Sequence, residues 1–262
     1  MRSSAIRRTA VAAAAVSLAL LAAGCGGGSD SGSDGKGKDA KGKESAAAEP
    51  AAKALTAAEL EKAALAQGDV KGHKISEAAA KDVVAVDDIK VEKEVCAPLA
   101  NALMGAQVGE PGAFTKRTVV SEPKKGSMDK ATENPEDAFK SAFDITTTQL
   151  ALGSYEGKGA QDSIAALRTA ATECAGGFEF TAAGEKQKLS KITEAQVEAG
   201  EESVAWTVVL EQDGEKGEMK LAALRQGSSF ASFSSMNLAA MGGGGSFELP
   251  TAVIEAQAAK LA

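Results

Sequence analysis

The stretch SVAWTVVLE, residues 203–211, alternates its side chains with a period of two, which predicts a β-strand. The alternation divides the segment into two faces. One face carries Val204, Trp206, Val208 and Leu210, and the other carries Ala205, Thr207 and Val209. The neighbouring runs of sequence then decide what kind of sheet this strand joins.

Similar short runs lie on both sides of this segment. We expect strands over 145–152, 178–182, 188–197, 218–225 and 229–238. The triplet Gln212-Asp213-Gly214 lies between two of the runs and indicates a hairpin. The polar interval 122–136 is typical of a long exposed loop, and the glycines at 242–245 are typical of a flexible joint. Consecutive short strands with tight turns predict an antiparallel sheet.

Helical periodicity occurs before, between and after these strands. We expect helices over 56–66, 94–104, 159–174 and from 250 to the C-terminus. Thr56 and Glu59 have the spacing of a capping box, and Pro98 is tolerable in the first turn of its helix. Amphipathic helices bury their apolar stripes against a sheet. The predicted fold class is therefore α+β, with an antiparallel β-sheet packed with helices in a layered sandwich.

The first 24 residues have the layout of a secretory signal peptide. Three arginines precede an apolar run over 10–23, which as a helix would be about 21 Å long against a hydrocarbon core of about 30 Å. The sequence LAAGC at 21–25 resembles a bacterial lipobox, so we expect Cys25 to carry lipid. The alternative is an ordinary signal peptide in which Cys25 is incidental. Both Sec and twin-Arg export remain open.

The exported part divides into a tether and a domain. Residues 25–50 are rich in Gly, Ser, Asp and Lys and lack large apolar side chains, which predicts a flexible tether. Residues 51–262 have the composition of a folded protein and are expected to form a single α+β domain. Loss of three arginines with the signal lowers the formal net charge from −7 to −10. This charge disfavours nucleic acid as a partner, and it leaves membrane attachment to the acyl chains of the anchor.

Two cysteines remain once Cys25 is assigned to lipid. An exported chain with an even number of thiols most often pairs them, so we expect a disulfide between Cys96 and Cys174. A reactive redox pair and a metal site are the rival interpretations. The wide spacing, with no Cys-x-x-Cys pair, favours a structural disulfide over both.

The sequence holds little that is typical of catalysis. It contains one His, one Tyr and one Trp, and it has no nucleophile elbow, Walker A motif, zinc-protease motif or EF-hand spacing. His73 and the acidic pairs Asp87-Asp88 and Glu201-Glu202 are best interpreted as solvated groups. We therefore predict that the protein is not an enzyme and has no cofactor, no metal site and no catalytic residues.

One strand has a composition that could line a pocket. Residues 228–237 combine Phe230 and Phe233 with several serines and an asparagine. The favoured interpretation is that both phenylalanines lie in the core and the serines face water. The residues of a ligand-binding site are not identified by the sequence.

The order of these features resembles a known group of proteins. A first helix ends near Val70-Lys71-Gly72, a second carries Cys96, the helix with Ser163-Ile164-Ala165-Ala166-Leu167 ends at Cys174, and Leu249-Pro250 begins the last helix. This layout resembles the sensor-type lipoproteins of actinobacteria and is similar to the extracellular sensor domain of mycobacterial PknH-type serine/threonine kinases. The resemblance implies an antiparallel sheet with helices, disulfide stapling and a cleft for a small ligand. The chain departs from those kinases in lacking a kinase domain and in having one possible disulfide.

The function expected is that of a surface-anchored lipoprotein on the extracytoplasmic face of the cell membrane, with a non-enzymatic ligand-binding or sensor-like domain. Its partners would be the membrane, through the lipid anchor, and a small ligand or an envelope protein. The alternatives are a cell-envelope interaction protein without a small ligand and a carrier of lipid or glycolipid.

Overall fold

The computed structural model describes residues 53–80, 83–123, 143–212, 214–241 and 245–262. All of them belong to a compact unit that spans Ala47–Ala262. The signal peptide, Cys25, the tether, most of the loop expected over 122–136 and most of the glycine joint lie outside the described residues. Within the described part, no helix combines the length and the apolar character that a membrane crossing requires.

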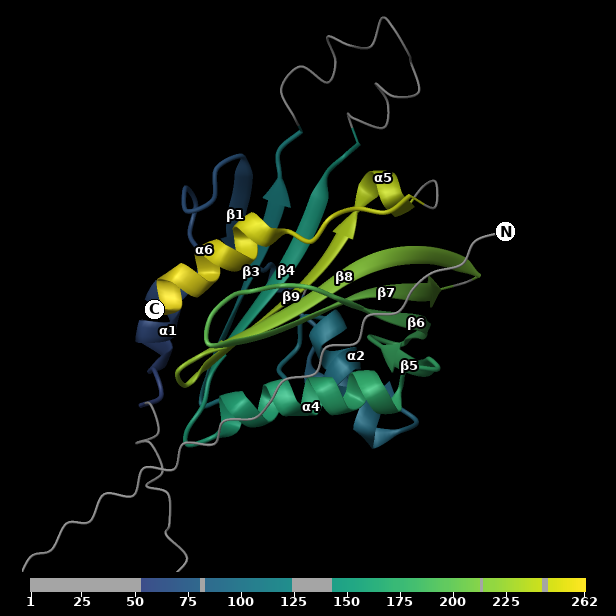
Figure 1. The fold of residues 1–262 in the computed structure, drawn as a ribbon, viewed down its shortest axis with the longest axis horizontal. Coiled ribbons are helices and arrows are strands. Elements are labelled where there is room, and N and C mark those ends of the chain that lie inside the picture. Colours follow the sequence, from purple (N-terminus) through teal and green to yellow (C-terminus); the bar gives the residue numbers. More distant parts are fainter. Residues whose placement is uncertain (1–52, 81–82, 124–142, 213, 242–244) are drawn as a thin grey trace, which may run out of the picture. The chain divides into compact units, whose positions relative to one another are not determined.

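The strands of the described residues form one nine-stranded sheet in the order β1-β3-β4-β9-β8-β7-β6-β5-β2, and every neighbouring pair is antiparallel. The strands are β1 (His73–Glu77), β2 (Ile89–Val91), β3 (Ala113–Ser121), β4 (Thr146–Ser154), β5 (Phe178–Ala182), β6 (Glu185–Ala195), β7 (Glu202–Gln212), β8 (Glu215–Gln226) and β9 (Ser229–Asn237). Figure 1 shows the long strands β7, β8 and β9 side by side. The hairpin expected around 212–214 joins β7 to β8, where Gln212 pairs with Glu215.

The helices are α1 (Ala57–Ala63), α2 (Ala97–Leu103), α4 (Gly159–Glu173), α5 (Leu238–Met241) and α6 (Thr251–Leu261), with short 3₁₀ turns η2 (Val86–Asp88) and η3 (Glu94–Cys96). Thr56 caps α1 as expected: its hydroxyl accepts from the Glu59 amide, and the Glu59 carboxylate accepts from the Thr56 amide. The helix expected over 94–104 is divided between η3 and α2, and Pro98 lies in the first turn of α2.

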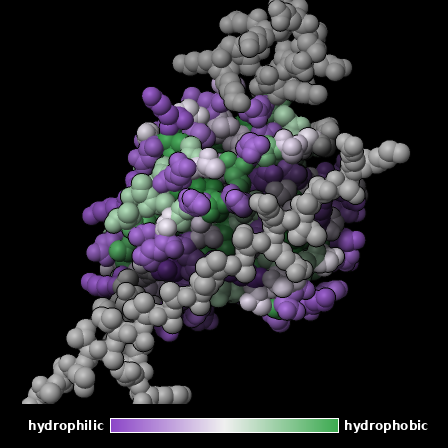
Figure 2. Space-filling model, viewed as in Figure 1, coloured by the Kyte–Doolittle hydropathy of each residue, from purple (hydrophilic) through white to green (hydrophobic). Residues whose placement is uncertain are grey.

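Helices cover both faces of the sheet, and each face has its own apolar cluster (Figure 1). Strand β8 shows this directly, because Leu221 and Ala223 belong to the cluster with α2 and α4, whereas Ala222 and Leu224 belong to the cluster with α1 and α6. The α+β class and the antiparallel sheet are confirmed, while the layered sandwich stays a prediction. Figure 2 shows the face that carries α6, where hydrophobic surface gathers beside the helix and hydrophilic side chains surround it.

Strands β1, β2 and β3 complete the sheet, although the sequence pattern did not indicate them. In β3 two adjacent cations, Lys116 and Arg117, interrupt the alternation, yet both are buried. Arg117 lies on the side of α1, where its guanidinium donates to the Leu65 carbonyl at 3.0 Å and pairs with Glu61. A buried cation is tolerated here because its donors are satisfied.

The outer edge of the sheet at β1 is capped by a side chain. The carboxamide of Gln67 accepts from the Ile75 amide at 2.9 Å and donates to the His73 carbonyl at 3.2 Å. A single glutamine thus satisfies a donor and an acceptor that a further strand would otherwise use.

Two polar contacts hold α6 against the region of α1. Gln257 is fully buried, accepts from the Leu65 amide at 3.1 Å and donates to the Ala63 carbonyl at 2.8 Å. Lys260 donates to the Asp69 carboxylate at 2.7 Å. These contacts connect the two ends of the described chain, and they compensate for the weak amphipathicity of an Ala-rich helix.

Candidate functional site

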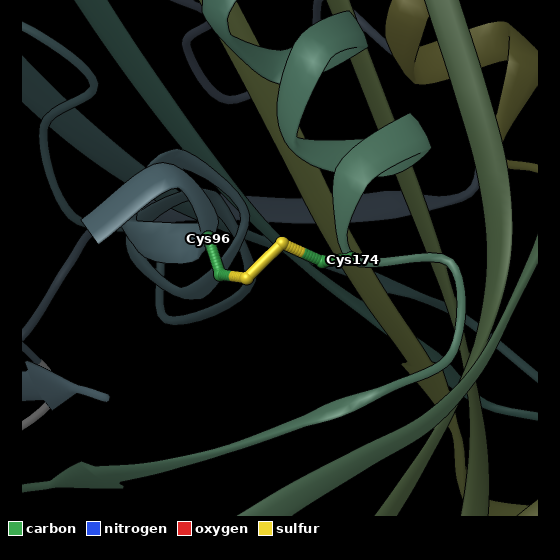
Figure 3. Close-up of a disulfide and its surroundings, with 2 residues drawn as sticks. All are labelled: Cys96 and Cys174. Carbon is green, nitrogen blue, oxygen red and sulfur yellow. A yellow bond between two sulfur atoms is a disulfide. The ribbon is translucent and has the colours of Figure 1, made fainter. Parts of the chain in front are cut away.

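The Cys96–Cys174 disulfide is present and joins the two helices that cover one face of the sheet. Cys96 ends η3 and Cys174 follows the last residue of α4 (Figure 3). Their Cα atoms are 6.0 Å apart, and the two residues are 0% and 2% exposed. This pairing is the one that the sequence predicted, and its burial fits a structural role.

The serine-rich strand β9 contributes no residue to the hollows of the described surface that are named below. Phe230 and Phe233 are buried in opposite clusters, as expected. The serines do not face water, which corrects that part of the prediction, because helices cover both faces of β9. The Ser234 hydroxyl donates to the Leu103 carbonyl at 2.7 Å, and the Ser235 and Thr148 hydroxyls lie 2.9 Å apart. These hydroxyls therefore position α2 and β4 rather than a ligand.

Of the groups with acid–base potential, His73 and Tyr155 are held in structural contacts. His73 lies on the edge strand β1, with Nδ1 3.0 Å from the Lys71 carbonyl. Burial raises the pKa of Tyr155 to about 12, and its hydroxyl donates to the Val108 carbonyl. Asp87 and Asp88 are exposed in η2, as predicted. The structure brings none of these groups together into an acid–base pair within the described residues.

Glu201 and Glu202 are not simply solvated, in contrast to the sequence interpretation. The Arg225 guanidinium contacts Glu201 at 2.5 Å and Glu202 at 3.3 Å, and Arg168 also pairs with Glu202. Partial burial alone would raise the pKa of Glu202, but hydrogen bonds from the two guanidinium groups outweigh it and lower that pKa. Two arginines thus share two carboxylates at the start of β7.

Open hollows of 330 to 510 Å³ lie along the described surface. The hollow of 470 Å³ is bordered by exposed charges of β5 and β6, among them Glu179 and Lys188, which face each other across the ladder. Hollows of 440 and 510 Å³ meet at Val83 and Phe114, next to residues 81–82, which lie outside the described part. Charged and polar side chains make up most of the border of the first hollow, and the other two lie next to residues outside the described part.

The hollow of 330 Å³ combines an apolar wall with charged groups, as small-molecule sites do. We call it the Trp206 hollow. It is lined by Arg168, Ala171 and Thr172 of α4, Ile192 and Glu194 of β6, and Val204, Ala205 and Trp206 of β7. It contains the only tryptophan of the chain.

Three elements position the walls of the Trp206 hollow. Glu194 is the direct partner of Trp206 across the β6–β7 ladder, so the carboxylate stands beside the indole. Val204 lies two residues before Trp206 and therefore on the same face of β7. Helix α4 packs over this face and contributes Arg168, whose side chain is 48% exposed. The result is an apolar surface between a cation and an anion.

Sequence reasoning found Trp206 as a strand residue that faces the side of Val204 and Val208, and this face is confirmed. It did not find Arg168 or Glu194 as neighbours of Trp206. The single tryptophan was the one signal that could have drawn attention to the place. No group of three or more His, Cys, Asp and Glu side chains suited to a metal ion occurs among the described residues.

Comparison with known proteins gives a structural likeness but no family. No family model matches the chain, and no curated protein matches it. The chain is similar to the extracellular domain of PknH from Mycobacterium tuberculosis, with a TM-score of 0.43 and 11% sequence identity, over 80% of this chain and 95% of that chain.

Proposed function

We propose that the protein is a lipid-anchored lipoprotein on the extracytoplasmic face of the cell membrane, and that its domain binds a small ligand without transforming it, in the manner of a sensor. The observation that carries the binding role is the Trp206 hollow. Its apolar wall, exposed arginine and neighbouring carboxylate are groups that recognise a ligand by shape and charge.

Two features support the location. A buried disulfide persists in oxidising compartments, and the Cys96–Cys174 bridge is buried. The lipobox-like LAAGC sequence at 21–25 supplies a cysteine for acylation. Firm anchoring needs two or more acyl chains, which a lipoprotein cysteine would carry.

The placement of the polar groups favours binding over catalysis. The imidazole of His73 is on the far edge strand β1, while the Trp206 hollow lies between β6, β7 and α4. A carrier of lipid would need an enclosed apolar cavity, whereas the hollows named above are open. These positions support a ligand held at the surface of the domain.

The anchor is tested by fractionation and mass. The full chain should partition with membranes, and its mature form should begin at Cys25 with added acyl mass. Cys25→Ala should release the protein from the membrane fraction. A Cys25→Ala protein that stays fully in membranes, or a mature mass without acyl chains, would overturn the anchoring proposal.

Binding is tested with a thermal-shift screen of cell-wall fragments, lipids and metabolites. The protein used is the tether-free exported chain, residues 51–262, and Trp206 emission is then measured for each compound that raises Tm. A ligand of the hollow should raise Tm and change the emission, because Trp206 is the sole indole. Ala171→Phe would place a large ring in the hollow from its α4 wall and should abolish binding of the hit compound. Ala165→Phe, at an exposed position of α4, should leave this binding unchanged. Absence of any stabilising compound would count against the binding role.

A further inference from the structure

The Trp206 hollow holds one charge that is uncommitted and one that is shared. The Glu194 carboxylate makes no hydrogen bond and no ion pair within the described residues. It is exposed and stands opposite Trp206. A carboxylate in this position can accept from a cationic or N–H donor group of a ligand at no loss of an internal contact.

Arg168 can also turn to a ligand without leaving an anion unpaired. Its partner Glu202 keeps a second guanidinium, because Arg225 Nε lies 3.3 Å from the Glu202 carboxylate. The Arg168 side chain is 48% exposed, so it can move without uncovering much of the protein surface beneath it. A guanidinium presents a fork of donors that suits a carboxylate.

Between these two charges the wall is apolar. Ile192, Val204 and Trp206 come from adjacent strands and lie on the same face of the sheet. The volume of 330 Å³ is at the lower end of the range for ligand pockets, so the occupant must be small.

We propose that the Trp206 hollow takes a small zwitterion with an apolar body, the chemistry of a free amino acid with an aliphatic side chain. Arg168 donates to its carboxylate, Glu194 accepts from its ammonium group, and its side chain lies against Ile192, Val204 and Trp206. This assignment rests on the proposed binding function and names the class of ligand for it.

Three related probes separate the contributions of the two charges. Leucine carries both groups, leucinamide lacks the carboxylate, and 4-methylpentanoate lacks the ammonium group. Each probe is titrated into the tether-free exported chain while Trp206 emission is followed. Leucine should bind at least about tenfold more tightly than either analogue, because each analogue lacks one charge-assisted hydrogen bond.

Charge-neutral variants assign each contact to a residue. In Arg168→Gln the preference for leucine over leucinamide should disappear, and in Glu194→Gln the preference over 4-methylpentanoate should disappear. Lys188→Gln and Glu179→Gln remove the same charges from exposed positions on the opposite face of the sheet, and they should leave all three affinities unchanged. A thermal melt of each variant checks that it is folded.

The outcomes distinguish this inference from the function on which it rests. Equal binding of the three probes, or preferences that survive in both hollow variants, would overturn the zwitterion assignment. A screening hit that raises Tm without altering Trp206 emission would also overturn it, while leaving a binding function elsewhere on the domain. No binding by leucine and no hit in the screen would overturn both.

Discussion

Loss of the Cys96–Cys174 disulfide is expected to lower the free energy of unfolding by about 4.5 kcal/mol. The two cysteines are 78 residues apart, and cross-linking a loop of this length restricts the unfolded chain by that amount in the loop-entropy model. Domains of this size are commonly stable by about 5–15 kcal/mol, so the change is a large part of the total.

The native surroundings of the bridge increase the loss. Both residues are almost completely buried, at 0% and 2% exposure, and they lie within the apolar cluster under α2 and α4. Replacement of both by alanine removes two sulfur atoms from this packing and adds roughly 1 kcal/mol. The double variant Cys96→Ala/Cys174→Ala should therefore fold marginally, with the sheet more stable than the helix layer above it.

Urea unfolding of the oxidised protein and of the double variant, followed by Trp206 emission and by far-ultraviolet circular dichroism, measures the difference. The variant should also show a larger m-value, because its unfolded chain is no longer cross-linked and exposes more surface. Cys96→Ala alone also breaks the bridge but keeps the Cys174 sulfur. Its difference from the double variant therefore measures what that one sulfur contributes to packing.

A loss below about 1 kcal/mol would refute the reasoning, since it would mean that the bridge does not constrain the unfolded chain as the loop length requires. Accessibility gives an independent check. Because the sulfurs are buried, reductant under native conditions should act only through unfolding, so its rate should follow the unfolding rate. Rapid reduction of the folded protein would show that the helix layer opens on its own.

Three further contacts give separate predictions. Gln67→Ala should destabilise the fold by about 1 kcal/mol and promote self-association, because the edge of β1 loses its cap; a monomer by analytical ultracentrifugation with unchanged Tm would contradict this. Gln257→Leu should lower the free energy of unfolding by about 3 kcal/mol, because the buried Leu65 amide and the half-buried Ala63 carbonyl lose their partner; an unchanged urea midpoint would count against it. A hydrogen bond from Lys260 and then one from a backbone amide lower the pKa of Asp69 below 3.8, so its contribution is complete above that pH and is lost as the pH falls through the lower native value. Asp69→Asn should therefore flatten the acid limb of stability against pH, and a difference from the parent protein that stays constant between about pH 6 and pH 2 would show that this pair contributes nothing.

The central and C-terminal strands follow from local sequence. The bounds of β5 are those expected, and β4, β6, β7, β8 and β9 differ from expectation by a few residues at their ends. These segments have alternating or β-branched sequences, and the turns between them contain glycine. Strong local preference and final pairing agree there, so the antiparallel sheet could be read from the sequence.

The N-terminal strands follow from long-range pairing. Strand β2 has three residues and pairs only with β5, at the opposite edge of the sheet from β1. A segment so short carries no periodicity that a sequence can reveal. In β3 the cations at 116 and 117 are polar by type and buried by context. The position of α1 and its Glu61 carboxylate explains the burial of Arg117, while the neighbouring Lys116 lies beside Gly105, after α2.

The Trp206 hollow depends on a single irregularity of pairing. Leu189, the partner of Leu210, lies on the face that α2 and α4 cover. Strict alternation would place Lys191 and Thr193 on that same face and would turn Glu194 to the other. The β6–β7 register instead shifts between Leu189 and Lys191, so Ile192 and Glu194 lie on the face that α4 covers.

The same shift has an opposite consequence on the other face. It turns Ala195 and Val197 toward the cluster with α6, where they pack as half-buried apolar side chains. Burial of these two residues on one face therefore fixes the register that presents the Glu194 carboxylate beside Trp206 on the other. A period-two pattern gives no sign of the extra residue between Leu189 and Lys191, because its position depends on which face each half of β6 can bury. For this reason Glu194 is recognised as the partner of Trp206 only in the folded sheet.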